Sequence, residues 1–246
     1  MDQQRLQRVF DILEYLAVSP ATVSEVSRAL DIPLSSSHDL LQAMLKVDAV
    51  AIRGRKYMVG WKAIGVSTSV LGSNSLQQVS RTHVEQVARA TGCCARLAVP
   101  HGDRVSYTVE VLGGCAAGVV SVLGRPLVLH ATAVGRLFAA YDPNINARLR
   151  AELEADCATP AVRDQVAKQI ENIRVTGHSV AREGRPGWVS LAMPVRDAAG
   201  DLVAAVQMDV SPDLVSSMGR EGLLSNIRGS AVAIEIAVKG SVPVAI

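Results

Sequence analysis

The sequence predicts an α+β protein made of two parts, and two patterns lead to this prediction. Within the first 60 residues, three short stretches with helical spacing of apolar residues precede two β-prone runs. From about residue 76 onward, valine-rich runs and helical stretches alternate in blocks, which is typical of an antiparallel sheet covered by helices. With 246 residues, 49% of them hydrophobic and 20% charged, the chain is long enough for about two globular domains.

Two amphipathic helices are expected first. Apolar residues recur at intervals of three and four along the first of them: Leu6, Val9, Phe10, Leu13 and Leu16. This helix should end at Ser19-Pro20, because proline cannot continue a helix. A second helix should begin after Thr22, since Thr22 and Glu25 have the spacing of a capping box, and it should stop before Pro33.

A third helix is predicted over 33–45, where the sequence reads PLSSSHDLLQAML. We expect its apolar face, Leu34, Leu41, Met44 and Leu45, to pack on the first two helices, as in a helix-turn-helix. Its first turn, with three serines and a histidine, would then point outward, where hydroxyls and free backbone N–H groups suit phosphates and base edges. The alternative is that Ser36 and Asp39 form a capping box and that the neighbouring serines are merely solvated.

A two-stranded hairpin, or wing, should follow over 50–53 and 56–59, joined at Gly54-Arg55. The basic residues Arg53, Arg55 and Lys56 cluster at its tip. Residues 1–62 hold eight Lys or Arg and seven Asp or Glu, a net charge of only +1. Binding to DNA should therefore rest on few phosphate contacts, with a modest dependence on salt.

The rest of the chain is expected to form a linker and a second domain. The domain prediction is 1–60 for the winged helix-turn-helix, 61–75 for a linker helix and hinge, and 76–246 for the sheet domain. Helices are predicted near 61–71, 76–92, 131–141, 146–155, 160–175 and after 212, and strands over 94–99, 104–112, 189–196 and 202–210.

Composition argues against several classes of function. Aromatic residues are 3% of the chain, so binding of nucleic acid by base stacking is not expected. The net charge of +2 neither requires nor excludes an anionic partner. Cys93, Cys94, Cys115 and Cys157 form no CxxC pair, and MDQQRLQRV is no secretory signal. We expect no disulfide, no metal, no cofactor, no membrane partner and a cytoplasmic location.

The order of parts, with HATAVGR at 130–136 and RPGWVSLAMPVRDAAGDLVAAVQM at 185–208, resembles the IclR family of bacterial transcription regulators over essentially the whole chain. The resemblance implies a GAF-like effector domain that binds a small metabolite. It also implies a homodimer, or a dimer of dimers, on a palindromic double-stranded DNA operator. In the linker region, which commonly contributes dimer contacts in this family, the candidates are Ile64, Val66, Val70 and Leu71.

The recognition helix departs from the family pattern. Leu34 and Asp39 stand where relatives often have basic residues, so two positive charges are absent. Base reading would fall to the polar residues of the helix, with Asp39 either a cap or an acceptor for a cytosine amino group. The complete predicted DNA-binding set is Arg28, Ser35, Ser36, His38, Gln42, Arg53, Arg55 and Lys56.

The resemblance also implies an effector pocket over the sheet, under the helix that begins with the HAT motif. The predicted contacts are Ala133, Val134, Trp188, Ser190, Gln207 and Asp209. Relatives often have Cys or Ser at the first of the three polar strand positions and serines at the other two. The pocket is therefore expected to be more polar and negative, and Asp209 argues against a small dianionic effector.

Each of these residues also has a plain structural interpretation. His130 is expected to be a hydrogen-bonded histidine ahead of a helix, and Trp188 either a lid or part of the core. Asp209 either caps the next helix, pairs with an arginine or touches the ligand, and Cys93 and Cys94 fit buried apolar positions.

Two competing functions use the second domain. The first is a small-molecule hydrolase in which Cys93, Cys94 or Cys115 works with His130, although no GxSxG, HExxH or phosphate loop anchors such a site. The second is a thiol-based redox sensor with the same cysteines, for which Arg96 is the only basic residue nearby in sequence. The main prediction remains a DNA-binding regulator whose operator affinity is modulated by a metabolite, without enzymatic activity.

Overall fold

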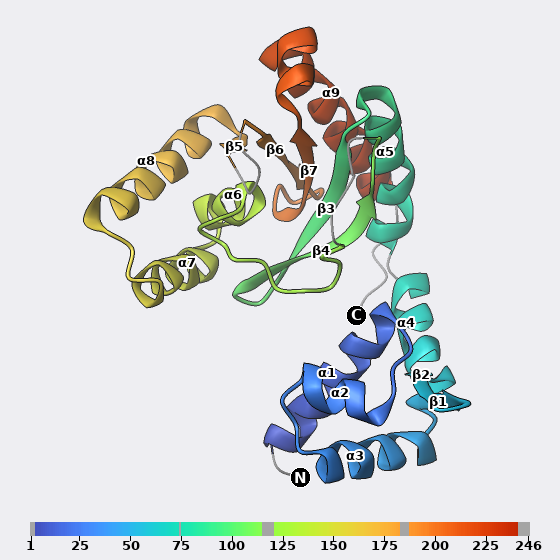
Figure 1. Cartoon of the computed structure of the whole chain (residues 1–246). Coiled ribbons are helices and arrows are strands. Elements are labelled where there is room, and N and C mark those ends of the chain that lie inside the picture. Colours follow the sequence, from blue (N-terminus) through green and yellow to red (C-terminus); the bar gives the residue numbers. More distant parts are fainter. Residues whose placement is uncertain (1–2, 74, 115–120, 183–186, 241–246) are drawn as a thin grey trace. The chain divides into compact units, whose positions relative to one another are not determined.

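The computed structural model describes residues 3–73, 75–114, 121–182 and 187–240 (Figure 1). The chain divides into two compact units, residues 1–74 and 75–246. Cys115 and the first two residues of the stretch 185–208, for which the sequence made predictions, lie outside the described residues, as do the side chains of Val70 and Leu71. Each unit is described by itself.

The N-terminal unit is a winged helix-turn-helix, as predicted. Its elements are α1 (Gln3–Val18), α2 (Val23–Ala29), α3 (Leu34–Lys46), β1 (Val50–Arg53), β2 (Lys56–Val59) and α4 (Trp61–Ser73). The antiparallel pair β1–β2 has the predicted bounds, and Gly54 adopts φ 64° in its two-residue turn, a conformation that glycine adopts without strain. Ile12, Leu41 and Tyr57 are among the buried residues of its core.

Local sequence signals fix the first helices. α1 ends at Val18, ahead of Pro20, and the Thr22–Glu25 capping box is formed in full. The backbone N–H of Thr22 donates to the Glu25 carboxylate at 2.7 Å, and this bond, with the Thr22 hydroxyl, lowers the pKa of Glu25. Ala21 and Tyr57 exchange two backbone hydrogen bonds of 2.9 and 2.7 Å, which tie the start of α2 to the wing.

The C-terminal unit is built on a five-stranded antiparallel sheet in the order β4-β3-β7-β6-β5. Its elements are α5 (Ser75–Thr91), β3 (Cys94–His101), β4 (Arg104–Val111), α6 (Ala133–Tyr141), α7 (Pro143–Ala155), α8 (Pro160–Thr176), β5 (Ser179–Ala181), β6 (Val189–Arg196), β7 (Leu202–Val210) and α9 (Pro212–Gly240). The sequence does not predict β5, because three residues are too few to show a period.

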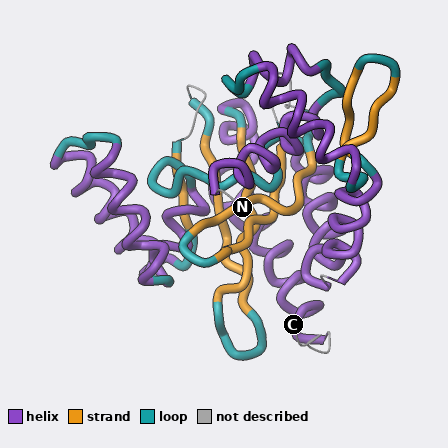
Figure 2. Tube along the Cα trace, turned by 90° about the horizontal axis from the view of Figure 1, so that it is seen from below, coloured by secondary structure: helices purple, strands orange, loops and turns teal. Residues whose placement is uncertain are grey.

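Helices cover both faces of this sheet (Figure 2). α5 and α9 pack on one face around residues such as Leu97, Met208 and Ile227. α6 packs on the other face with α7 and α8 around it, where the sheet contributes small residues such as Ala192 and Ala205. Small side chains on the α6 face let this helix approach the strands closely. None of the described helices is both long and apolar enough to cross a bilayer.

Candidate functional site

The first turn of α3 exposes Leu34 and Ser35 to solvent, which differs from the predicted pattern. Pro33 is the N-cap residue, and no side chain caps the helix, so the alternative of a Ser36–Asp39 capping box is wrong. Leu34 is 55% exposed, so its assignment to the buried stripe is also wrong. The buried apolar residues of α3 are Leu40, Leu41 and Met44. Leu34, the first helical residue, lies six residues before Leu40, the first buried apolar residue of the helix.

The three serines have different roles. Ser35 is exposed, Ser36 is half-buried and Ser37 is fully buried. The Ser37 hydroxyl donates to the carbonyl of Ile32 at 3.4 Å, and the Ser27 hydroxyl of α2 donates to the same carbonyl at 2.7 Å. The Ser37 hydroxyl therefore bonds to the turn between α2 and α3, and only the first two serines remain available to a partner.

His38 and Asp39 extend the exposed surface of α3, whereas Gln42 has a partner within the unit. The His38 Nδ1 lies 3.6 Å from a carboxylate oxygen of Asp39, and both side chains are more than half exposed. Gln42 is half-buried, and its Nε2 donates to the hydroxyl of Tyr57 on β2 at 2.9 Å. This bond between the recognition helix and the wing joins residues 15 apart, so helical periodicity alone does not reveal it.

Four basic side chains of the predicted DNA-binding set are exposed. Arg53, Arg55 and Lys56 occupy the tip of the β1–β2 hairpin, and Arg28 lies in the last turn of α2. None of the four forms a salt bridge with another described residue. The unit therefore carries an exposed helix turn and a basic wing tip.

In the C-terminal unit, the HATAVGR stretch builds the start of α6. The Thr132 hydroxyl accepts the Gly135 N–H at 3.2 Å, and the Arg136 Nε donates back to the His130 carbonyl at 2.8 Å. The His130 ring is bonded to Asp156 at 2.8 Å, in agreement with its structural interpretation. A Cβ at Gly135 would stand 2.3 Å from the Leu129 carbonyl oxygen, so this position requires glycine.

A row of mostly polar residues crosses the sheet on the face covered by α6. Strand pairing aligns one residue from each strand in the order Ser179, Ala192, Gln207, Arg96 and Glu110. The next row brings Ser190 beside Asp209. Ala133 and Val134, in the first turn of α6, are fully buried in the same layer as Ala192. The predicted effector residues on α6, β6 and β7 therefore belong to one buried layer.

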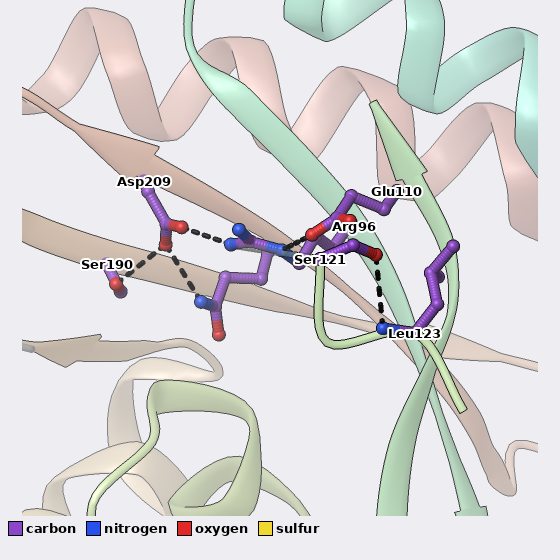
Figure 3. A network of polar contacts seen from close by, with 7 residues as sticks. Arg96, Glu110, Ser121, Leu123, Ser190 and Asp209 are labelled. Carbon is purple, nitrogen blue, oxygen red and sulfur yellow. Dashed lines mark hydrogen bonds and ion pairs between the residues drawn. The ribbon is translucent and has the colours of Figure 1, made fainter. Parts of the chain in front are cut away.

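Arg96 pairs with carboxylates on both neighbouring strands of this layer, and the sequence did not identify it as a site residue. Its side chain is 7% exposed, its Nε donates to Glu110 at 2.7 Å, and its terminal nitrogen donates to Asp209 (Figure 3). Burial alone would lower the pKa of Arg96, but the charge of Asp209 and the hydrogen bonds to Glu110 and Asp209 raise it above its usual range. The sequence did contain a signal for Arg96, because it lies in an otherwise apolar strand, and a buried charge needs a charged or hydrogen-bonding partner.

Asp209 accepts three hydrogen bonds. Besides Arg96, the Ser190 hydroxyl and the Gln207 Nε2 donate to it, each at 2.8 Å. Of the three expected roles for Asp209, the structure has the pairing with an arginine. The Arg96 guanidinium offsets one of the two carboxylates, Glu110 and Asp209, so the formal charge of the group is −1, the same as that of Asp209 alone.

Two buried atoms in this row lack a hydrogen-bond partner among the described residues. They are the Gln207 Oε1 and the Ser179 Oγ, on either side of Ala192 in the row. The bond from Nε2 to Asp209 fixes the Gln207 amide, so its oxygen must face elsewhere. Buried polar groups are rarely left unsatisfied, which marks this place as one where water or a ligand is needed. Trp188 is half-buried just before β6.

The thiol arrangement favours neither competing function. Cys93 and Cys94 are 1% exposed, and among the described residues the His130 ring bonds to Asp156 and not to a cysteine. Arg96 is occupied by two carboxylates. Within the described ranges, no group of three or more His, Cys, Asp or Glu is placed to hold a metal ion.

Two family models match this chain. The IclR helix-turn-helix domain matches residues 5–51, and the bacterial transcriptional regulator IclR C-terminal domain matches residues 68–236. The chain belongs to the IclR family of bacterial transcription regulators. Members with this domain pair are HTH-type transcriptional regulators, so the family assignment and the α+β fold predicted from the sequence are both confirmed.

Characterised relatives and solved structures agree with this assignment. The chain is 23% identical to the HTH-type transcriptional regulator XynR of Escherichia coli, covering 96% of this chain and 97% of XynR. It is 25% identical to the E. coli repressor AllR, and the match covers 83% of this chain and 79% of AllR. The IclR structure from Thermotoga maritima shares the fold of this chain, with a TM-score of 0.72 and 21% sequence identity. The match covers 97% of this chain and 100% of the T. maritima chain. An IclR homologue from Microbacterium hydrocarbonoxydans, complexed with 4-hydroxybenzoate, also shares the fold. Its TM-score is 0.72 and its sequence identity 22%, and the match covers 96% of this chain and 100% of the homologue.

Proposed function

We propose that this IclR-family chain regulates transcription by binding a palindromic operator sequence-specifically and that a small metabolite in its C-terminal unit modulates this binding. The observation that carries the proposal is the combination, in one compact unit, of the exposed first turn of α3 with the unpaired basic tip of the wing. A helix end in the major groove and a cationic hairpin on the phosphates are the contacts that such a surface can make.

The exposed residues of α3 suggest what kind of base edge each would contact. Ser35, Ser36 and His38 offer donors and acceptors, and Asp39 offers only acceptors, which suits a cytosine amino group. Leu34, exposed at the helix start, suits the methyl group of a thymine. Gln42 contributes only if it exchanges its bond to Tyr57 for a base.

Phosphate contacts fall to the basic side chains. Arg53, Arg55 and Lys56 extend from the wing tip, and Arg28 adds a cation at the end of α2. Four such contacts give a modest salt dependence, consistent with the low net charge of residues 1–62. Affinity would then depend more on the fit of α3 than on charge.

Homodimerisation, or a dimer of dimers, would place two recognition helices about 34 Å apart, one turn of DNA. The N-terminal unit has exposed apolar side chains that such an interface would cover: Leu6, Phe10, Trp61, Ile64 and Val66. Trp61 is 79% exposed, which is a large apolar surface for a free monomer. Ile64 and Val66 were linker candidates in the sequence.

The effector is proposed to bind in the buried layer formed by Ala133, Val134, Ser190, Gln207 and Asp209, with Trp188 at its margin. The unpartnered Gln207 Oε1 and Ser179 Oγ support a ligand that donates at least one hydrogen bond. The complex of the M. hydrocarbonoxydans homologue with 4-hydroxybenzoate supports ligand binding in this family. Binding alone would not regulate: the effector must favour one arrangement of the dimer, and a coupling of about 1–3 kcal/mol would change operator affinity about 5- to 150-fold.

We place this regulator in the cytoplasm, where it would meet chromosomal DNA, and assign it no catalytic reaction. The buried cysteines and the engaged His130 support this choice over the hydrolase and redox alternatives. Turnover of esters or amides by the purified chain, or release of DNA by peroxide and not by metabolites, would favour one of those alternatives.

The test is a titration of the purified chain against a DNA fragment from beside its own gene, with excess random DNA and several salt concentrations. Specific retention is expected, and Arg55→Ala should weaken both specific and random binding and reduce the salt slope by about 1. Arg150→Ala, an exposed arginine of α7, is the matched control and should change neither. Equal affinity of the wild-type chain for specific and random DNA would contradict the proposal.

A further inference from the structure

A cavity of about 700 Å³ lies in the C-terminal unit beside the edge strand β5. Its walls come from the segment before α6, from α6 and α8, from β5, β6 and β7, and from α9. Ser190, Gln207 and Asp209 do not line it, so it is separate from the proposed effector site. Its volume falls in the range of small-molecule pockets. We call it the β5 groove.

The groove lies where the edge strand β5 is shorter than its neighbour β6. The last residue of β5, Ala181, pairs with Ser190 of β6. β6 continues one residue further, where Val189 pairs with Val210 of β7 and has no partner on β5. Val189 and Val210 both line the groove at this open corner of the sheet. The groove thus shares two strands with the effector site but lies at their ends.

The polar lining of the groove is cationic. Arg136, Arg182 and Arg220 come from α6, from just after β5 and from α9, and the described lining residues include no Asp or Glu. Within the described residues, Arg182 and Arg220 form no salt bridge and no hydrogen bond. Two unpaired guanidinium groups beside one cavity can bind a carboxylate through charge-assisted hydrogen bonds.

The remaining lining is largely apolar. α8 turns one face to the groove, with Val162 and Val166 on it, and Leu191 and Leu223 add apolar surface from β6 and α9. Gln165 and Gln169 of the same α8 face are the only uncharged amides among the described lining residues. A phosphate or sulfate ion would leave most of this surface uncovered, whereas an aliphatic or aromatic body would bury it.

A backbone irregularity directs Arg220 at the groove. α9 is interrupted at Gly219, where φ is 68° and ψ is 159°, values that only glycine adopts readily. Arg220 follows immediately, and Val215 and Leu223 on either side of the kink line the groove. The kink lets both segments of α9 contribute to one wall.

We propose that the β5 groove is a second ligand site, which binds an organic monocarboxylate with an apolar body. The carboxylate would lie between Arg182 and Arg220, and the apolar body along the valine face of α8. This site goes beyond the proposed function, because it does not depend on DNA binding or on an effector at Asp209.

The experiment is calorimetric titration of the full chain, without DNA, with decanoate as the probe and decanol as its uncharged match. We expect saturable decanoate binding at one equivalent per chain and no saturable binding of decanol. Arg182→Gln and Arg220→Gln should each weaken decanoate binding at least about tenfold. Val162→Phe, which fills the groove without removing charge, should also weaken it. Arg150→Gln, an exposed arginine away from the groove, should leave it unchanged.

Three results would overturn the proposal. One is the absence of decanoate binding by the wild-type chain. Another is equal binding of decanol, which would indicate apolar partition without anion recognition. The third is binding that is unaffected by the arginine and Val162 substitutions but is lost in Ser190→Ala, which would place decanoate at the effector site and leave the proposed function standing.

Discussion

The first turn of α3 and the polar row of the sheet are both rich in polar side chains, but their surroundings differ. On α3, Ser35, His38 and Asp39 are exposed, and the His38 Nδ1 lies 3.6 Å from a carboxylate oxygen of its neighbour Asp39. On the sheet, Arg96 and Asp209 are bonded to each other and to three further side chains. An exposed polar group can still form hydrogen bonds with another molecule, whereas a buried one forms its hydrogen bonds within the fold.

The largest effect should come from disrupting the buried polar network of the sheet. Arg96→Met leaves the carboxylate of Glu110, which is 4% exposed, without its cation, and it removes a donor from Asp209. We expect the free energy of unfolding of the C-terminal unit to fall by about 3–5 kcal/mol in urea titrations.

A triple variant supplies the control for this prediction. Arg96→Met with Glu110→Gln and Asp209→Asn removes the charges together, so it should be less destabilised than Arg96→Met alone. A single variant that loses less than about 1 kcal/mol would mean that the network does not hold the sheet layer together.

The next largest effect on stability is expected at Gly135, where the α6 backbone lies close to that of Leu129. Gly135→Ala would force a methyl group against the Leu129 carbonyl and should cost about 1–3 kcal/mol of stability. Gly229→Ala in α9 is its match, since a Cβ there meets nothing within 4 Å, and it should stabilise by about 0.5–1 kcal/mol. Thermal unfolding of both variants checks the contrast, and equal shifts in Tm would refute the steric argument.

The capping box of α2 should contribute less. Thr22→Ala is expected to cost about 1 kcal/mol at neutral pH. Because the folded state lowers the pKa of Glu25, the contribution of this carboxylate is present above its unfolded pKa and is lost as the pH falls through its folded pKa. The difference between wild type and Thr22→Ala should therefore shrink in acid, and a difference that grows there would contradict the role of Glu25.

The smallest effect on stability concerns the bond between the recognition helix and the wing. Tyr57→Phe removes the hydroxyl that accepts from Gln42 and should cost about 0.5–1.5 kcal/mol, as should Gln42→Ala. If Gln42 serves only this bond, the two variants and their combination should be equally stable and should bind DNA equally. A specific loss of operator binding in Gln42→Ala alone would restore its predicted role in base reading.

The sequence predicted the elements whose signals are local. The wing bounds, the capping box and strands β6 and β7 follow from turn residues and short periods. Leu34 was misplaced because a helical stripe does not reveal where the covering core ends. The Arg96 network was missed because it joins residues up to 113 apart, and only strand order brings them together. The β5 groove depends on a strand too short to show a pattern.

We propose that the exposed residues of α3 recognise DNA. The most direct measurement is the ratio of specific to random DNA affinity, by fluorescence anisotropy, for wild type and for Ser35→Ala/His38→Ala. Both side chains are exposed, so the stability of the variant should match that of wild type, while the ratio should fall at least about tenfold. An unchanged ratio in a folded variant would show that Ser35 and His38 do not recognise DNA.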